Sequence, residues 1–182
     1  MKKLAHIALG IFCILAASCG SKQLETTYDK QESNIQAIVN TLTKDQESAT
    51  TDYNNGSVRV TLVHGDGEEL KEGGAVSFYY AGFFISSSRI SNSNLFATNY
   101  DTFANSVKWT VTDSTSFDIR TINLAEDDIV EGLRNGLIGV RGGDECYVLF
   151  SGKHGFGKKK FANIPSRSAL AYHLWIKSVT ND

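Results

Sequence analysis

The chain has 182 residues, of which 41% are hydrophobic and 21% are charged, which is enough for one globular domain with a sizeable core. Its 18 basic and 20 acidic residues give a formal net charge of −2, which argues against a nucleic-acid-binding surface. The single proline argues against a proline-rich linker. Short runs of Val, Ile, Phe and Tyr between Gly, Asn and Ser predict a mostly β domain.

The first residues have the pattern of an export signal. Two lysines precede an apolar run from Leu4 to Ala17, which is too short to span a bilayer comfortably, and the chain becomes polar directly after Cys19. Residues 15–19, Leu-Ala-Ala-Ser-Cys, resemble the lipobox of bacterial lipoproteins, which implies a signal peptide over residues 1–18 and a lipid on Cys19. We therefore expect a protein anchored to a membrane of the cell envelope, facing the periplasm or the cell surface. An ordinary signal peptide, with Cys19 as a bystander, is the alternative.

Residues 19–56 are predicted to contain a tether, a helix and a linker. The residues up to about Tyr28 are polar and predict a tether. A helix with one apolar face is expected from about Asp29 to Lys44, followed by a linker up to Gly56. The apolar residues at helical spacing are Ile35, Ile38, Val39 and Leu42. This face either packs on the domain or forms a homodimer with a second copy, and the sequence leaves both alternatives open.

From Val58 onward, apolar residues alternate with polar ones and glycine turns separate the predicted strands. The pattern predicts strands at 58–62, 75–80, 107–111, 117–122, 145–150 and 170–177. Two carboxylates precede apolar residues at helical spacing, which predicts a short helix from Asp127 to Ile138. The Ser- and Asn-rich segment 86–94 is typical of an exposed loop. One short helix among five or six strands is an α+β arrangement.

The cysteines predict no disulfide in the mature chain. Cys13 is removed with the signal peptide and Cys19 is capped by lipid, which leaves Cys146 without a partner. Because Cys146 lies in an alternating apolar run, we expect a buried core thiol.

Several kinds of chemistry lack their sequence marks. The four histidines are not at metal-ligand spacing, and no Gly-x-Ser-x-Gly turn of a serine hydrolase is present, so we expect no metal and no hydrolytic triad. Residues 152–158 begin like a phosphate-binding loop, but Lys159 stands where a Ser or Thr should bind magnesium. The three lysines at 158–160 are best explained as a solvated loop.

The order and spacing of several short segments resemble FKBP-type peptidyl-prolyl cis-trans isomerases in their bacterial lipoprotein form. The resemblance runs from about Val58 to Val179. It is carried by Tyr80–Gly82, Ile129–Leu133, Gly142–Asp144, His154–Gly157, Ile164–Ser166, Leu170 and Tyr172. It implies a curved antiparallel β-sheet wrapped around one short α-helix over residues 57–182, with the helix before it as an N-terminal extension.

The same resemblance implies an isomerase that assists the folding of exported proteins. Its partners would be proline-containing polypeptides, and it needs no cofactor. The resemblance places the site in an apolar cup and makes the backbone N–H of Val130 the donor to the substrate carbonyl. The implied site residues are Tyr80, Phe117, Ile129, Val130, Leu133, Phe156 and Tyr172, with Phe96, Ala97 and Ile164 as further substrate contacts. Aromatic residues at strand spacing are also ordinary core residues, which is the alternative reading of this set.

Three positions depart from the family pattern. Ala97 stands where the family has Asp, Leu133 where it has Trp, and Phe156 where it has Tyr. Each lost hydrogen-bond donor or acceptor removes on the order of 1 kcal/mol of stabilisation. The second hypothesis is therefore a catalytically weak or inactive FKBP-like chaperone or binding lipoprotein. A third is an envelope lipoprotein that serves assembly, with residues 86–94 as its contact surface.

Overall fold

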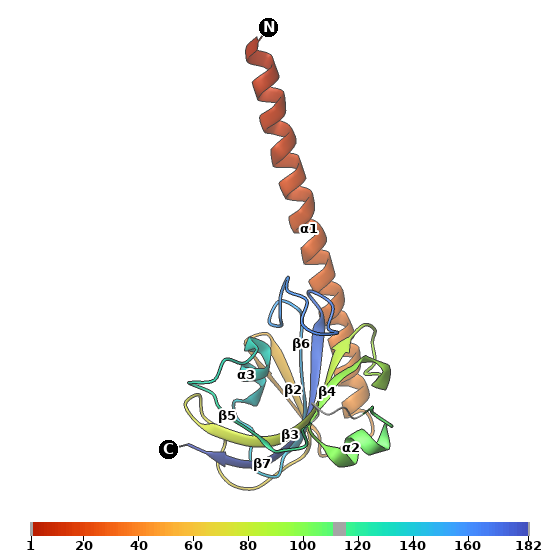
Figure 1. Ribbon diagram of the computed structural model, residues 1–182, viewed down its shortest axis with the longest axis vertical. Helices are drawn as coiled ribbons and strands as arrows, with labels where there is room; N and C mark the ends of the chain where they lie inside the picture. Colours follow the sequence, from red (N-terminus) through yellow and green to blue (C-terminus); the bar gives the residue numbers. More distant parts are fainter. Residues whose placement is uncertain (1, 111–115, 182) are drawn as a thin grey trace.

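The computed structural model describes residues 2–110 and 116–181, with side chains from Lys22 onward. A seven-stranded sheet forms the body of the molecule, and all of its strand pairs are antiparallel (Figure 1). The strands are β1 (Thr50–Asn54), β2 (Ser57–Val63), β3 (Ala75–Ile85), β4 (Leu95–Thr98), β5 (Arg120–Asn123), β6 (Glu145–Phe150) and β7 (Ala169–Thr180). The helices are α1 (Lys2–Thr43), α2 (Asp101–Ser106) and α3 (Glu131–Leu137), with a 3-10 turn η1 (Asn92–Asn94). This is the α+β fold with an antiparallel sheet and one short central helix that the sequence predicts.

The long strand β3 carries three neighbours. One of its edges pairs with β7, and the other edge is shared by β5, beside Ala75–Phe78, and β4, beside Ala81–Phe83. Asn99 joins the two short strands where they meet, because its side chain accepts from the Tyr80 N–H at 2.6 Å and donates to the Asp118 carbonyl at 2.9 Å. The sheet order is β1-β2-β6-β7-β3-β4. Tyr80 therefore lies between the part of β3 that pairs with β5 and the part that pairs with β4.

The two faces of the sheet bury two different cores, as the alternation of side chains along a strand requires. On one face, Val148 and Leu174 pack with residues of α3. On the other face, Leu149 and Ala171 pack with residues of α1. Figure 1 shows α3 and α1 on opposite sides of the sheet. Cys146 belongs to the first core, and it is fully buried and free, as expected from its strand position.

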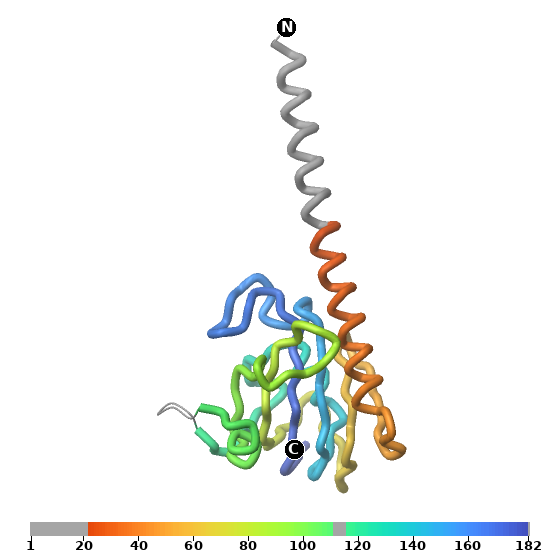
Figure 2. The backbone as a smooth tube through the Cα atoms, turned by 90° about the vertical axis from the view of Figure 1, so that its right-hand side faces the viewer, coloured from red at the N-terminus to blue at the C-terminus, as the bar shows by residue number. Residues whose placement is uncertain are grey.

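The helix α1 docks on the sheet through the apolar face that the sequence predicts. Ile35, Ile38 and Val39 are buried against the second core. In contrast to the predicted tether, residues 22–28 continue the same helix, which runs on beyond the sheet in Figure 2. No Gly or Pro interrupts residues 22–43, and Thr26 and Thr27 bond back to carbonyls four residues earlier. A polar segment of good helix formers therefore extends a docked helix instead of becoming a flexible chain.

The predicted linker contains a strand. β1 pairs with β2 along its whole length, so the sheet begins at Thr50 and not at residue 57. Asn55 and Gly56 join the two strands with φ angles of 43° and 81°. These values are typical of a tight hairpin turn, which favours Asn-Gly. The segment predicted as a linker therefore ends in a hairpin signal.

The strand predicted at 107–111 is wrong over its described part. Residues 101–106 form the helix α2, and Val107 and Lys108 form the turn that ends it. The Trp109 N–H donates to the Ala104 carbonyl at 2.9 Å, which folds the chain back on α2. Residue 111 lies outside the described residues. The exposed loop predicted for residues 86–94 is present, and η1 forms its last three residues.

Candidate functional site

A cavity of about 390 Å³ lies between α3, the first face of the sheet and the loop that precedes β7. We call it the cup. Its walls come from β3, β4, β5, β7, the entrance of α3 and that loop. They are formed by Phe78, Tyr80, Phe96, Ala97, Arg120, Ile122, Asp128, Ile129, Val130, Leu133, Phe156, Phe161, Ala162, Asn163, Ile164 and Tyr172.

The strand walls of the cup are aromatic. The Tyr172 ring meets the Phe96 ring edge-on at 5.8 Å between centroids, and it lies 6.2 Å from the Tyr80 ring. Tyr172 also stacks on Phe150 at 6.0 Å. Edge-on and offset contacts of this kind fix the rings in place. They give the cup rigid apolar walls.

Two glycines allow α3 to lie close to β6. A Cβ atom at Gly132 would meet the Phe150 ring at 2.2 Å, and one at Gly136 would meet the Val148 side chain at 2.1 Å. The Gly132 carbonyl also accepts from the Ser57 hydroxyl at 2.6 Å, which ties the helix to β2. Because no larger residue fits at these two positions, the sheet sets the position of α3, and Leu133 reaches the wall of the cup.

The chain enters α3 in an extended conformation. α3 begins at Glu131 and not at Asp127 as predicted, because Asp127 closes a turn by accepting from the Asn123 N–H at 2.7 Å. Val130 is the N-cap, with φ −61° and ψ 133°. The first N–H groups of a helix have no intrahelical acceptor. Among the described residues, the Val130 N–H donates to no other group, and Val130 lines the cup.

The loop between β6 and β7 forms the outer wall of the cup. Phe156 stacks on Phe161 at 4.6 Å, with an angle of 7° between the ring planes. Ile164 is 1% exposed and anchors the loop in the first core, while the Phe161 side chain is 57% exposed at the rim. The Gly132 N–H donates to the His154 carbonyl at 2.9 Å, which joins this loop to α3.

The cup contains polar groups as well as aromatic ones. Burial raises the pKa of Tyr172 and, less strongly, that of Tyr80, so both hydroxyls keep their protons at neutral pH. Arg120 opposes both shifts, which brings its positive charge close to these rings. Asp128 and Asn163 also line the wall. The polar groups of the family pattern that this chain lacks at Ala97 and Phe156 are therefore partly replaced by polar groups at other positions.

The structure brings together all of the predicted cup residues except Phe117. Phe117 is half-buried and precedes β5, whereas the cup is lined from β5 by Arg120 and Ile122. Side chains of a strand alternate between its faces, so a residue three positions before Arg120 does not share its side. Cys19 and the predicted signal peptide at 1–18 lie outside the residues whose side chains are described.

Several cup residues were missed in the sequence. Phe78 could have been found, because it lies two residues from the predicted Tyr80 on the same strand face. Ile122 lies two residues from Arg120, which was itself not predicted. Arg120, Asp128, Phe161, Ala162 and Asn163 had no such signal. Their positions depend on how the strands and the loop meet in space.

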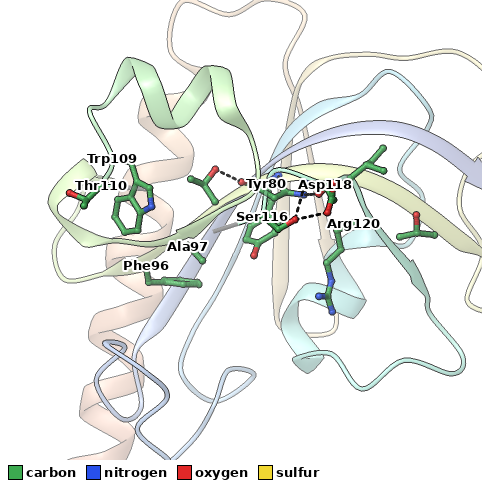
Figure 3. A pocket seen from close by; sticks show the side chains of 12 residues that line it. Tyr80, Phe96, Ala97, Trp109, Thr110, Ser116, Asp118 and Arg120 are labelled. Atoms are coloured by element: carbon green, nitrogen blue, oxygen red, sulfur yellow. Dashed lines mark hydrogen bonds between the residues drawn. The ribbon is translucent and has the colours of Figure 1, made fainter. Parts of the chain in front are cut away.

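A second cavity of about 740 Å³ adjoins the cup, and we call it the side cavity (Figure 3). The two share Tyr80, Phe96, Ala97 and Arg120 as a common wall. The rest of the side cavity is mostly polar, and its remaining lining residues are Thr98, Asn99, Trp109, Thr110, Ser116, Asp118, Ile119 and Thr121. The cup therefore opens sideways into a space lined by hydrogen-bonding groups.

The described residues contain neither a metal-ion site nor a membrane-spanning helix. Within residues 22–110 and 116–181, no three His, Cys, Asp or Glu side chains come together in a way that could hold a metal ion. In the same part of the chain, no helix is long and apolar enough to cross a membrane.

Comparisons with known proteins give similarities of structure. No protein-family model and no curated protein sequence matches the chain. FkpA from Escherichia coli is similar in structure, with a TM-score of 0.58 at 18% identity, over 95% of this chain and 70% of that one. A peptidyl-prolyl cis-trans isomerase from Pseudomonas syringae pv. tomato has a TM-score of 0.53 at 14% identity, over 83% of this chain and 96% of that one.

A plant domain shows the same similarity. The N-terminal domain of FKBP42 from Arabidopsis thaliana has a TM-score of 0.53 at 14% identity, over 72% of this chain and 93% of that one. At identities this low, the likeness is one of fold, and it agrees with the sheet, the central helix and the cup described above. The chain therefore has the fold of the FKBP-type peptidyl-prolyl isomerases.

Proposed function

We propose that this chain is a peptidyl-prolyl cis-trans isomerase that assists the folding of exported, proline-containing polypeptides in the cell envelope. The observation that carries the proposal is the cup, an apolar cavity of about 390 Å³ with aromatic walls and a free backbone donor at the entrance of α3. The fold shared with FKBP-type isomerases supports it.

The reaction requires rotation about one peptide bond and no covalent step. Rotation about a peptide bond faces a barrier of roughly 18–20 kcal/mol, and prolyl bonds interconvert over tens of seconds or more. The twisted amide loses resonance and much of its dipole. A water-poor apolar cup therefore favours it over the planar ground state, which lowers the barrier.

The Val130 N–H is the donor that the cup offers to the substrate carbonyl. It stands at an N-cap without a side-chain capping bond, and it donates to no other group among the described residues. A donor already held in place costs no reorganisation when the amide twists. The N–H orients the carbonyl while the rings surround the prolyl residue.

The isomerase proposal predicts that removal of this donor lowers activity. Val130→Pro removes the N–H, and the φ of −61° at this position suits proline. We expect kcat/KM for a Leu-Pro peptide to fall by about tenfold or more, since a bound carbonyl left without its donor costs about 1–3 kcal/mol. The measurement is proline isomerisation by the chain without residues 1–19. Val130→Ala keeps the donor and is the matched control.

A second pair of variants tests the cup itself. Phe156→Ala opens the cup wall, whereas Phe103→Ala removes an equally half-buried ring from α2 on the opposite face of the sheet. We expect a loss of activity in the first and near-normal activity in the second. A folded protein that does not accelerate isomerisation at all would sink the isomerase proposal.

The rim of the cup favours a second candidate function, a binding chaperone without turnover. Phe161 at the rim and Ile119 in the side cavity are 57% and 42% exposed, so apolar surface continues outside the cup. Ala97, Leu133 and Phe156 replace more polar or larger groups of the family pattern. Titration with the same Leu-Pro peptide separates the two functions, because binding without acceleration supports the chaperone alone.

We also propose that the protein is anchored in the envelope by lipid on Cys19. The support is the N-terminal sequence pattern, two lysines, an apolar run and Leu-Ala-Ala-Ser-Cys before a polar segment. Several acyl chains on one residue anchor a protein firmly, whereas one chain alone binds marginally.

The lipid proposal is tested by expression of the full chain and of Cys19→Ser in a Gram-negative host supplied with a clickable fatty acid. The full chain should carry the label and sediment with membranes, and Cys19→Ser should lose the label. An unlabelled wild-type chain in the soluble fraction would contradict the anchor and leave the isomerase proposal untouched.

A further inference from the structure

Arg120 is a cation at the boundary between the cup and the side cavity. It begins β5, pairs with Phe78 of β3, and lines both cavities. In Figure 3 its side chain extends away from Ser116 and Asp118, which hydrogen-bond to each other at 2.7 Å. The guanidinium is therefore directed away from the Asp118 carboxylate, which lies two residues earlier in the chain.

The Arg120 guanidinium has no partner among the described residues. It donates no hydrogen bond and forms no ion pair there. The other charged groups that face these cavities are Asp118, which accepts from Ser116, and Asp128, which lines the cup. Asp127, near the entrance of α3, accepts from the Asn123 N–H. A guanidinium with no partner among the described residues can donate to an incoming anion.

The charge of Arg120 acts on the interior of the cup more than the aspartates do. It opposes the rise that burial causes in the pKa of Tyr80 and of Tyr172, while no aspartate affects either group. A substrate bound against these two rings therefore lies within reach of the Arg120 charge, and Asp128 also lines the cup.

A polypeptide bound at its proline must leave the cup on both sides. The side cavity begins at Arg120 and is lined by groups such as Thr98, Ser116 and Thr121, which suit hydrogen bonds to an extended chain. The residue next to the proline therefore passes the guanidinium at the shared wall.

We propose that Arg120 selects client segments that carry Asp or Glu next to the proline, by binding that carboxylate where the cup opens into the side cavity. The role of Arg120 rests on the proposed function, because it requires a prolyl residue in the cup. It adds a substrate class, acidic prolyl segments, to that function.

Two series of peptides test this role. In one, the residue before the proline is Leu, Gln, Glu or Lys, and in the other the residue after it is varied in the same way. Isomerisation rates and dissociation constants are measured with the purified protein at low and at high salt. We expect Glu to be preferred over Gln by about fivefold in at least one series, with Lys the poorest. Added salt should weaken this preference, since the site is open to solvent.

The variants assign the preference to one side chain. Arg120→Gln should abolish the discrimination between Glu and Gln, and Arg120→Lys should keep part of it. Arg89→Gln removes the same charge from the exposed loop before β4, lines neither cavity, and should leave the preference unchanged. Because Arg120 is exposed, its replacement is not expected to unfold the protein.

The Leu-Pro peptides distinguish the two possible failures. If they are bound or isomerised but Glu and Gln are treated alike, or if the preference survives in Arg120→Gln, the role of Arg120 is overturned and the proposed function stands. If folded protein neither binds nor isomerises them, the proposed function fails, and the role of Arg120 fails with it.

Discussion

The buried His173 and the half-buried Glu145 form a pair on the face of the sheet that lies opposite the cup. The Nε2 of His173 lies 2.8 Å from a carboxylate oxygen of Glu145, and its ring stacks on Tyr147 at 4.1 Å. A carboxylate only accepts, so Nε2 carries the proton of a neutral imidazole. Nδ1 is buried and has no partner among the described residues, so a second proton there would be a buried donor without an acceptor.

This pair makes the stability of the fold depend on pH. Burial lowers the pKa of His173 below its ordinary value of 6.5, although Glu145 opposes the shift. The hydrogen bond from His173 lowers the pKa of Glu145, against a smaller effect of burial. A group whose pKa is lower in the folded state contributes stability above its unfolded pKa and loses it as the pH falls. Both groups therefore favour the folded state at neutral pH and lose this effect in acid.

We predict that the free energy of unfolding falls as the pH is lowered below 6.5, and that part of this slope disappears in His173→Gln. Urea unfolding at a series of pH values measures it. His64→Gln replaces an exposed histidine and is the matched control. An identical slope in wild type and His173→Gln would contradict the assignment.

At the residue scale, the sequence predicted the cup where a motif or an alternation identified it. Helical spacing and strand alternation predicted the elements that carry Val130, Leu133, Tyr80 and Tyr172, and the family resemblance predicted that these residues form a site. Arg120 could not be predicted, because a charged residue at the start of a strand gives no indication that a cavity lies beside it. Such residues become visible only once the neighbouring strands are placed.

Among the elements, α1 is predicted to stabilise the domain by docking on it. Ile38→Ala removes a side chain that is 2% exposed and should cost about 2–5 kcal/mol of unfolding free energy. Thr41→Ala changes an exposed residue of the same helix and should cost far less. Urea unfolding compares them. Equal costs for the two variants would mean that α1 is not docked on its own domain in solution.

The elements that sequence reasoning missed were decided by local turn chemistry and by context. β1 depends on the Asn55–Gly56 turn, which brings an otherwise polar segment alongside β2. The described part of the segment predicted as a strand at 107–111 is instead the turn that ends α2, where the Trp109 N–H donates to the Ala104 carbonyl. α2 itself packs on the sheet through Phe103, which meets the Phe83 ring edge-on. The apolar face of α1 was predicted, since helical spacing of apolar residues is a direct signal.

For the whole molecule, the fold class could be predicted and the strand order could not. Alternation along each strand requires a two-faced sheet, and the two buried clusters confirm it. The pairing of β2 with β6 and of β3 with β7 depends on contacts between distant segments. No periodicity within one segment contains that information.

This strand order also sets when the protein can fold. Val58 pairs with Leu149 and Val76 pairs with Val179, so one edge of β2 waits for β6 and one edge of β3 waits for β7, the last strand to be made. Until then, β2 and β3 have unpaired edges and the first core lacks one wall. Sheets with such distant pairings form slowly, and their incomplete chains are prone to aggregation. Formation of the whole sheet is therefore delayed until β7 has been made, and the growing chain has unpaired strand edges until then.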